Sequence, residues 1–271
     1  MRPDAAGCGL SRDFLAAIVR ATVNIRPPAA GMLRAGLRPK DTGQQLWGQW
    51  MPASMDYARA RINMVENQLR PNRIEDRALI EAMLNVPRER FVPRTLAGVA
   101  YADEDLRLPD GSYLIEPLVL ARLIQSARVD REDVVLVLGC ATGYAAAVLA
   151  RLAATVILLV PDEASATKVE PLLDELGADN VVVIAGGDPT AGHPGQAPFD
   201  VILLTGSVDA VPAALLEQIG ESGRLVAVVA NERVGRGVLF TRLHGVIGQR
   251  TLFDAQIPRL AGAIREAEFA F

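Results

Sequence analysis

The residues with the clearest chemical potential form a turn bounded by two glycines, Gly139–Gly143, with the sequence Gly-Cys-Ala-Thr-Gly. Small residues let a ligand approach the backbone, and the helix expected after the turn supplies unpaired N–H groups at its start. The dinucleotide pattern G-x-G-x-x-G is not met, because the chain has Ala141 and Tyr144 at two of its required positions. No Gly-Lys-Ser/Thr follows, as a phosphate-binding loop would require. The turn therefore predicts a small-molecule site and disfavours a nicotinamide, flavin or phosphate-loop site.

Strands and helices alternate around this turn. Nearly continuous apolar runs, typical of strands covered on both faces, occupy residues 134–138, 155–160, 181–184, 201–204 and 224–229. Helices are expected between them at 143–153, 163–176 and 211–219. The alternation predicts an α/β fold with a doubly wound, mostly parallel sheet, which binds ligands beyond the carboxyl ends of its strands. Two last strands, 237–243 and 246–253, predict an antiparallel hairpin at the edge.

The chain divides near residue 55. Residues 1–54 hold six arginines and one lysine against three aspartates, with scattered Gly and Pro and no sustained period. We expect them to be a disordered N-terminal extension. Residues 55–271 are expected to form one domain, in which 55–128 is a helical, substrate-side segment and 129–271 is the cofactor-binding sheet. Apolar spacing predicts helices around Ile62 to Leu69, Leu79 to Leu84 and Leu118 to Ile124.

Composition excludes several classes of protein. The chain has 28 Lys and Arg against 32 Asp and Glu, so a strongly basic nucleic-acid surface is missing and no nucleic-acid partner is expected. Apolar runs such as 156–160 are far shorter than the roughly 20 residues of a spanning helix, so no membrane contact is expected. Two cysteines, Cys8 and Cys140, make neither a disulfide framework nor a cysteine zinc cage. We expect a cytoplasmic protein without a metal.

Several longer motifs follow one another in a specific order. They are Met64–Arg70 (MVENQLR), Val86–Pro93 (VPRERFVP), Ala100–Leu106 (AYADEDL), Gly139–Tyr144 followed by Ala146–Ala150, and Ala197–Ile202 (APFDVI). Over about residues 55–230 the chain resembles the protein-L-isoaspartate O-methyltransferase family. The resemblance implies the Rossmann-like fold of class I S-adenosylmethionine-dependent methyltransferases, a seven-stranded, mostly parallel sheet with an antiparallel edge strand.

The same resemblance implies an activity. The family transfers a methyl group from S-adenosylmethionine to the free carboxylate of isoaspartyl residues in damaged proteins, which would be this chain's partners. That carboxylate is ionised at neutral pH and needs no general base before it attacks. The two histidines, His193 and His244, are accordingly interpreted as surface residues.

The resemblance also assigns site residues by position. The substrate-binding segment is Tyr113, Leu114, Ile115 and Glu116, in which Ile115 replaces the family's active-site Ser and Glu116 its Gln, so no catalytic residue is assigned. The cofactor-binding positions are Gly139, Cys140, Ala141, Thr142, Gly143, Val160, Asp162, Gly187 and Asp188.

Some of these positions depart from the family pattern. Val137 and Val160 stand where acids are usual, and Ala141 replaces the middle glycine. Asp162 is an alternative ribose acceptor if the register changes, and Asp188 is either the adenine-side acid or a turn residue. Two interpretations of Glu116 also stay open, an acid facing the substrate carboxylate and a charge at a helix N-cap.

These departures leave a second hypothesis about function. The chain is then a catalytically degenerate methyltransferase-fold binding or interaction module that has lost cofactor binding. Loss of two charge-assisted hydrogen bonds to the ribose would cost on the order of 3 kcal/mol, which is more than a hundredfold in affinity.

Overall fold

The computed structural model describes residues 56–231 and 234–260. Contacts along the chain separate Met1–Ser54 from a second unit, Met55–Phe271, to which all the described residues belong. The predicted extension 1–54 lies outside the described residues, as does the end of the predicted domain from residue 261 onward.

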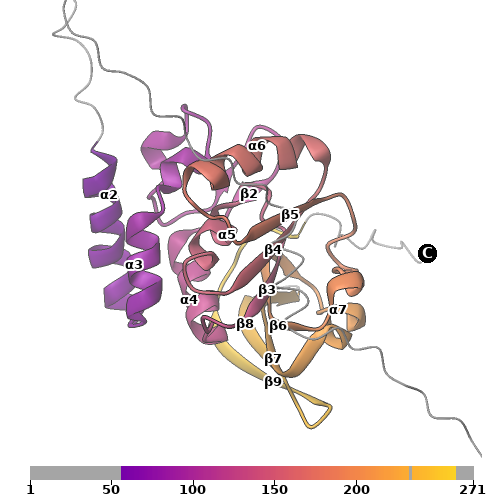
Figure 1. Cartoon of the computed structure of the whole chain (residues 1–271). Coiled ribbons are helices and arrows are strands. Elements are labelled where there is room, and N and C mark those ends of the chain that lie inside the picture. Colours follow the sequence, from indigo (N-terminus) through magenta and orange to yellow (C-terminus); the bar gives the residue numbers. More distant parts are fainter. Residues whose placement is uncertain (1–55, 232–233, 261–271) are drawn as a thin grey trace, which may run out of the picture. The chain divides into compact units, whose positions relative to one another are not determined.

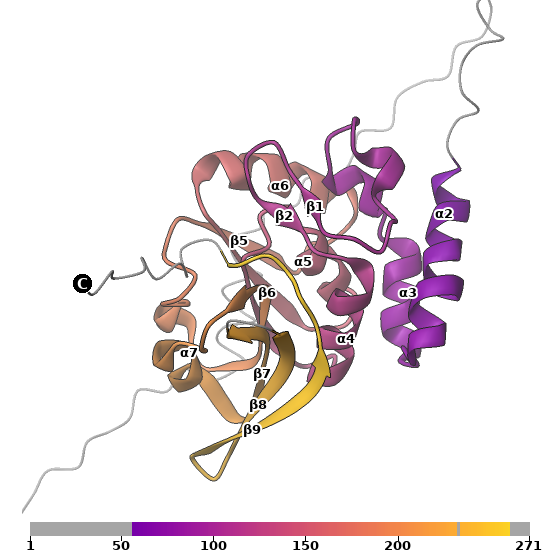
Figure 2. The same cartoon turned by 180° about the vertical axis from the view of Figure 1, so that it is seen from behind.

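Two short helices begin the described part and lie side by side next to α4 (Pro117–Ala127) in both Figure 1 and Figure 2. Helix α2 (Tyr57–Met64) continues into a π-helical turn, Val65–Leu69, and helix α3 follows at Arg77–Asn85. Asp56 and Asp76 cap them by accepting hydrogen bonds from backbone N–H groups three residues on.

The predicted apolar stripe of α2 is wrong at Ile62, which is 48% exposed. Val65 and Leu69 are fully buried. The wider π-helical turn, which starts at Val65, changes the helical period of 3.6 residues on which the stripe was predicted. Short 3-10 helices connect the elements at Arg70–Asn72, Arg88–Phe91, Ala97–Val99 and Pro194–Gln196.

The main sheet has seven strands in the order β5-β4-β3-β6-β7-β8-β9, which confirms the predicted fold class. Five neighbouring strands are parallel: β3 (Val134–Leu138), β4 (Thr155–Val160), β5 (Val181–Ala185), β6 (Phe199–Val208) and β7 (Ile219–Asn231). Strand β8 (Val234–Leu243) runs opposite to them, and the edge strand β9 (Val246–Asp254) pairs antiparallel with β8. The strand order reverses between β3 and β6, which is where such sheets bind ligands.

Helices cover both faces of this sheet. Helices α4, α5 (Tyr144–Leu149) and α6 (Glu163–Glu175) contact one face and α7 (Ala213–Glu217) the other (Figure 1). Along β3 the side chains alternate, with Val135 and Val137 in one apolar cluster and Leu136 and Leu138 in the other. The continuous apolar runs are thereby explained. No helix in the described ranges is both long and apolar enough to cross a membrane.

Helix α5 is shorter than the predicted helix 143–153, ending at Leu149. Beyond it, the side-chain amide of Asn180 donates hydrogen bonds of 2.9 and 3.0 Å to the carbonyl oxygens of Ala150 and Ala153. These bonds hold the chain in a turn that leads directly into β4. Helix α7 is also shorter than predicted, whereas β6 and β7 are longer.

A small antiparallel hairpin, β1 (Leu106–Arg107) and β2 (Tyr113–Leu114), precedes α4. Its turn contains Asp110, whose carboxylate accepts hydrogen bonds from the backbone N–H and the hydroxyl of Ser112. Gly111 has a φ of +83° there, in the region that favours glycine. The hairpin brings the predicted substrate segment to the start of α4.

Arg224, on β7, connects the end of α4 to the beginning of β3. Its guanidinium donates to the carbonyl oxygens of Ala127 and Arg128, each at 2.7 Å, and to the Asp133 carboxylate at 2.6 Å. We expect Arg224→Met to lower the free energy of unfolding by about 2–3 kcal/mol, because it removes three charge-assisted bonds and leaves Asp133 without its cation. Urea unfolding of the full chain measures this.

The matched control is Arg236→Met on β8. Arg236 and Asp254 are 3.9 Å apart and their side chains are 61% and 78% exposed, so this change should stay within about 0.5 kcal/mol. Equal losses in the two variants would contradict the structural role assigned to Arg224.

Candidate functional site

A cavity of about 960 Å³ lies at the carboxyl ends of β3, β4, β5 and β6, within the size range of small-molecule sites. It contains several residues that the sequence predicted for the site. Those among its walls are Tyr113, Gly139, Ala141, Val160, Gly187 and Asp188. Residues separated by up to 75 positions in the chain are thus brought together at the predicted edge of the sheet.

Other residues that line the cavity were not predicted from the sequence. Thr205 and Gly206 follow the apolar part of β6, where the rule on strand ends would have found them. Asp105 belongs to the motif Ala100–Leu106 but was given no role, and the segment Gln256–Leu260 carried no recognisable signal. The remaining walls are Gly111, Ser112, Leu159, Pro161 and Pro189.

Three residues of the predicted loop, Cys140, Thr142 and Gly143, do not line the cavity. The Gly143 N–H donates to the Cys140 carbonyl at 3.3 Å, and the Tyr144 N–H donates to the Thr142 hydroxyl at 3.3 Å. The expected unpaired N–H groups at the helix start are therefore wrong for Gly143 and Tyr144. Cys140 is buried, and its sulfur lies 3.8 Å from the Thr142 hydroxyl.

The open face of Gly139 is covered by the chain's own C-terminal segment. Gly139 has a φ of +82°, and a Cβ there would lie 2.3 Å from Leu260 Cδ1. A Cβ on Gly206 would lie 2.7 Å from Leu260 Cα. The segment is fixed by the Ser207 N–H, which donates to the Pro258 carbonyl at 2.8 Å, and by the Leu260 N–H, which donates to the Ser207 carbonyl at 2.9 Å. Both glycines line the cavity, and the absence of a side chain at each of them leaves room for Leu260.

The positions predicted to hold the nucleoside differ in their surroundings. Val160 is buried at the end of β4 and presents no polar group to the cavity that it lines. Asp162 lies outside the cavity walls and caps α6, with its carboxylate accepting from the Ser165 N–H at 2.7 Å. This position does not favour the alternative in which Asp162 holds the ribose.

Asp188 is a turn residue that also lies in the cavity wall, so its adenine-side role stays a prediction. Its Oδ1 accepts hydrogen bonds from the Thr190 N–H at 2.8 Å and from the Thr190 hydroxyl at 2.6 Å, as expected of a turn residue. It also lines the cavity directly after Gly187, which has a φ of +97°.

The predicted substrate segment has one residue in the cavity wall, Tyr113. Leu114 and Ile115 are buried at 3% exposure, so Ile115 packs as a core residue at the position of the family's Ser. Glu116 is the N-cap residue of α4 by position, but its side chain makes no capping hydrogen bond. Burial, followed by the nearby charges of Asp103 and Asp105, raises the pKa of Glu116 to about 7.

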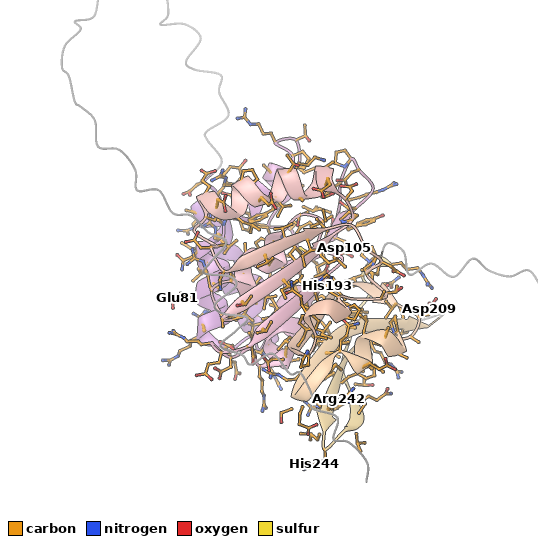
Figure 3. The ribbon with its side chains drawn as sticks, turned by 45° about the vertical axis from the view of Figure 1, so that its right-hand side comes forward. Glu81, Asp105, His193, Asp209, Arg242 and His244 are labelled. Carbon is orange, nitrogen blue, oxygen red and sulfur yellow. The ribbon has the colours of Figure 1, made fainter. Side chains whose placement is uncertain are left out.

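The histidines lie apart from the cavity walls, as Figure 3 shows for His244 at the hairpin turn between β8 and β9, well separated from Asp105. The His193 backbone N–H donates to the Gln218 side chain at 2.8 Å. Among the residues with described placement, no group of three or more His, Cys, Asp or Glu side chains is arranged to hold a metal ion.

The sheet order, the helices on both faces and the cavity at the strand switch point define a class I methyltransferase fold. One similar solved structure is a protein-L-isoaspartate O-methyltransferase with 23% identity and a TM-score of 0.64, covering 76% of this chain and 66% of that one. Another is a Plasmodium falciparum protein assigned as such an enzyme, solved with S-adenosyl-L-homocysteine, with 17% identity and a TM-score of 0.65 over 74% and 98% of the chains. At these identities the likeness establishes the fold.

The family follows from sequence comparison. The model of the protein-L-isoaspartate (D-aspartate) O-methyltransferase family matches residues 60–252. A Koribacter versatilis protein-L-isoaspartate O-methyltransferase is 36% identical over 215 residues, covering 78% of this chain and 96% of the relative. A Shewanella sediminis relative of the same name is 39% identical over 178 residues, covering 66% and 72%. The chain belongs to the protein-L-isoaspartate O-methyltransferase family, which confirms the resemblance predicted from its motifs.

The raised pKa of Glu116 has a consequence for stability. A carboxyl group whose folded-state pKa is raised stabilises the fold below its ordinary pKa of 4.5, and that contribution is lost as pH rises through about 7. Glu116→Gln should therefore raise Tm by roughly 2–4 °C at pH 8, which is about 1 kcal/mol after solvent screening of a half-buried group.

The gain should shrink toward zero at pH 4.5, where the glutamate is protonated in the folded protein. Thermal unfolding of both chains between pH 4.5 and 8 provides the measurement. A gain of equal size at both ends of this range would show that the carboxylate charge is not its cause.

Proposed function

We propose that the protein is a protein-L-isoaspartate O-methyltransferase, which uses S-adenosylmethionine to methylate isoaspartyl carboxylates of damaged proteins. Family membership carries this proposal, because the family model matches residues 60–252 and relatives that share this name are matched over 96% and 72% of their length. The cavity supports it, since family positions from three strand ends and from the substrate segment meet around one space.

The residues present fit the cofactor, with one weak region. Gly139 and Ala141 follow β3, Val160 ends β4, and Gly187 and Asp188 follow β5, so they would hold the cofactor at the strand ends, where this fold binds ligands. Asp188 offers a carboxylate at the adenine side. Val160 offers no acceptor to the ribose hydroxyls, so affinity at that end is expected to be reduced.

The proposed reaction needs no acidic or basic side chain to move a proton, because the attacking carboxylate is already ionised at neutral pH. When bound, S-adenosylmethionine supplies a methyl group on a positively charged sulfur. An isoaspartyl carboxylate oxygen forms the new bond to that methyl carbon while the carbon–sulfur bond breaks, and the products are a methyl ester and S-adenosylhomocysteine. The protein's contribution is alignment of the two reactants, which is worth several kcal/mol. A buried Ile115 at the family's Ser position is compatible with such a mechanism.

The competing hypothesis, a degenerate binding module, has no support from the comparisons. The two relatives and the two solved structures described above are all named as methyltransferases. The finer assignments of partners and location belong to the same proposal. We infer that the partners are isoaspartyl proteins or peptides, with no nucleic acid and no membrane, and that the location is cytoplasmic. A net charge of −4 and a total of two cysteines support these assignments.

Titration of the full chain with S-adenosylmethionine, followed by transfer of a tritiated methyl group to an isoaspartyl peptide, tests the function. We expect heat of binding and labelling of the isoaspartyl peptide, with the normal aspartyl isomer as the control acceptor. Absence of binding at millimolar cofactor would support the degenerate module. Binding with equal labelling of both isomers would contradict the substrate assignment.

The ribose region gives a separate prediction. Val160→Glu places a carboxylate in the cavity wall and should tighten S-adenosylmethionine binding about tenfold or more, because each charge-assisted bond contributes roughly 1.5–3 kcal/mol. The neutral acceptor in Val160→Gln should give a smaller gain, and Val160→Met, which adds size alone, should give none. Calorimetric Kd values measure the series. Equal Kd values of Val160→Glu and Val160→Met for S-adenosylmethionine would mean that residue 160 does not adjoin the ribose.

A further inference from the structure

A single peptide group in the substrate segment is held from both sides by charged side chains. The Ile115 carbonyl oxygen accepts a hydrogen bond of 2.5 Å from Arg88 Nη2. The Glu116 N–H, which belongs to the same peptide unit, donates to Asp105 Oδ1 at 2.9 Å. Because the carbonyl and the N–H of a trans peptide point in opposite directions, the guanidinium and the carboxylate grip this unit from opposite sides.

Arg88 is an unusual residue to find in this position. It is fully buried, and burial lowers its pKa. Its Nε donates to the Ala100 carbonyl at 2.6 Å, while its Nη1 is buried without a hydrogen-bond partner. Burying a cation costs free energy unless its surroundings compensate for the charge. If this position served packing alone, an apolar side chain of similar size would be more stable there.

The charge of Arg88 is compensated from two directions. Its guanidinium carbon lies 4.8 Å from the ring centroid of Tyr144, the first residue of α5 and the residue after Gly143 of the predicted cofactor loop. Across the 115–116 peptide, the charge acts on Asp105, whose pKa is raised by burial and lowered in part by Arg88. Arg88 thus contacts both the substrate segment and the helix of the cofactor loop.

Asp105 joins this arrangement to the cavity. It lines the cavity wall together with Tyr113, which is three residues before Glu116. Figure 3 labels Asp105 near the ends of the strands. A shift of the 115–116 peptide would therefore displace Tyr113 at the wall and α4 at its first turn.

We propose that Arg88 and Asp105 are positioning residues for methyl transfer, which together fix the Ile115–Glu116 peptide and so set the substrate segment relative to the cofactor loop. This inference rests on the proposed function. Both side chains act through the peptide unit that they hold, so we expect the loss of either to weaken binding of the acceptor peptide.

The test uses Asp105→Ala and Asp105→Asn in the full chain. Asp105→Ala removes the acceptor and should raise KM for an isoaspartyl peptide about tenfold, while kcat at saturation and the Kd of S-adenosylhomocysteine change less than twofold. Asp105→Asn keeps an acceptor oxygen and should restore most of the lost affinity. The control is Glu104→Ala, an exposed neighbour that does not line the cavity and should leave KM within twofold.

Amide hydrogen exchange gives a readout that does not depend on activity. Residues 113–116 should exchange faster in Asp105→Ala than in the unchanged chain, whereas β4 should exchange at the same rate in both. In Arg88→Lys, which keeps the charge but has one donor group in place of the fork, exchange in 113–116 and KM should both rise.

The outcomes separate the inference from the function on which it rests. Unchanged exchange in 113–116, or an active Asp105→Ala with unchanged KM, would overturn the inference and leave the function intact. A parallel fall in kcat and in cofactor affinity would also overturn it, because it would indicate general structural damage. No methyl transfer by the unchanged chain would contradict the proposed function, and the exchange result would then decide whether the two charges fix the peptide.

Discussion

Burial of both faces of the parallel strands is the constraint on which the rest of the structure depends. Strands such as β3 and β4 can contribute apolar side chains alone, because α4, α5 and α6 cover one face and α7 with Leu260 covers the other. Polar chemistry is then confined to the strand ends and to the segments packed against them. The cavity, Asp188 and Thr205 all lie at these ends.

The same constraint explains why the N-terminal segment matters to the site. The strand ends bring few charged groups to the cavity, and part of its wall comes from chain that precedes the sheet. This part is the segment 105–116, in which the β1–β2 hairpin brings Asp105 and Tyr113 to the cavity. Their placement depends on buried polar bonds from Arg88, which is part of a short 3-10 helix.

Much of the fold could be predicted because its information is local. Apolar runs predicted the positions of β3 and β4 to the residue. The switch-point rule predicted the turn at Gly139 and the family resemblance predicted Asp188, and both residues line the one cavity. The contribution of Leu260 could not be predicted, since its contact with Gly139 joins positions 121 residues apart and no pattern in residues 256–260 announces it. Asp105 lies in the motif Ala100–Leu106, but its role could not be predicted, because the motif contains three acids and only the folded hairpin shows which of them accepts from the Glu116 N–H.

Charge around Glu116 shows how substitutions in this site are tolerated. If Glu116 were ionised, it would form a group of three negative charges with Asp103 and Asp105 at the place where an anionic substrate is expected to bind. The pKa of about 7 means that Glu116 is partly protonated at neutral pH, and a protonated carboxyl group can donate a hydrogen bond, as the side-chain amide of a Gln can. Arg88 offsets part of the remaining negative charge by acting on Asp105 through the intervening peptide. The departures from the family pattern on this side of the cavity are therefore compatible with an anionic substrate. The departure with the larger expected effect on binding is Val160, which offers no hydrogen-bond acceptor where the family usually has an acid.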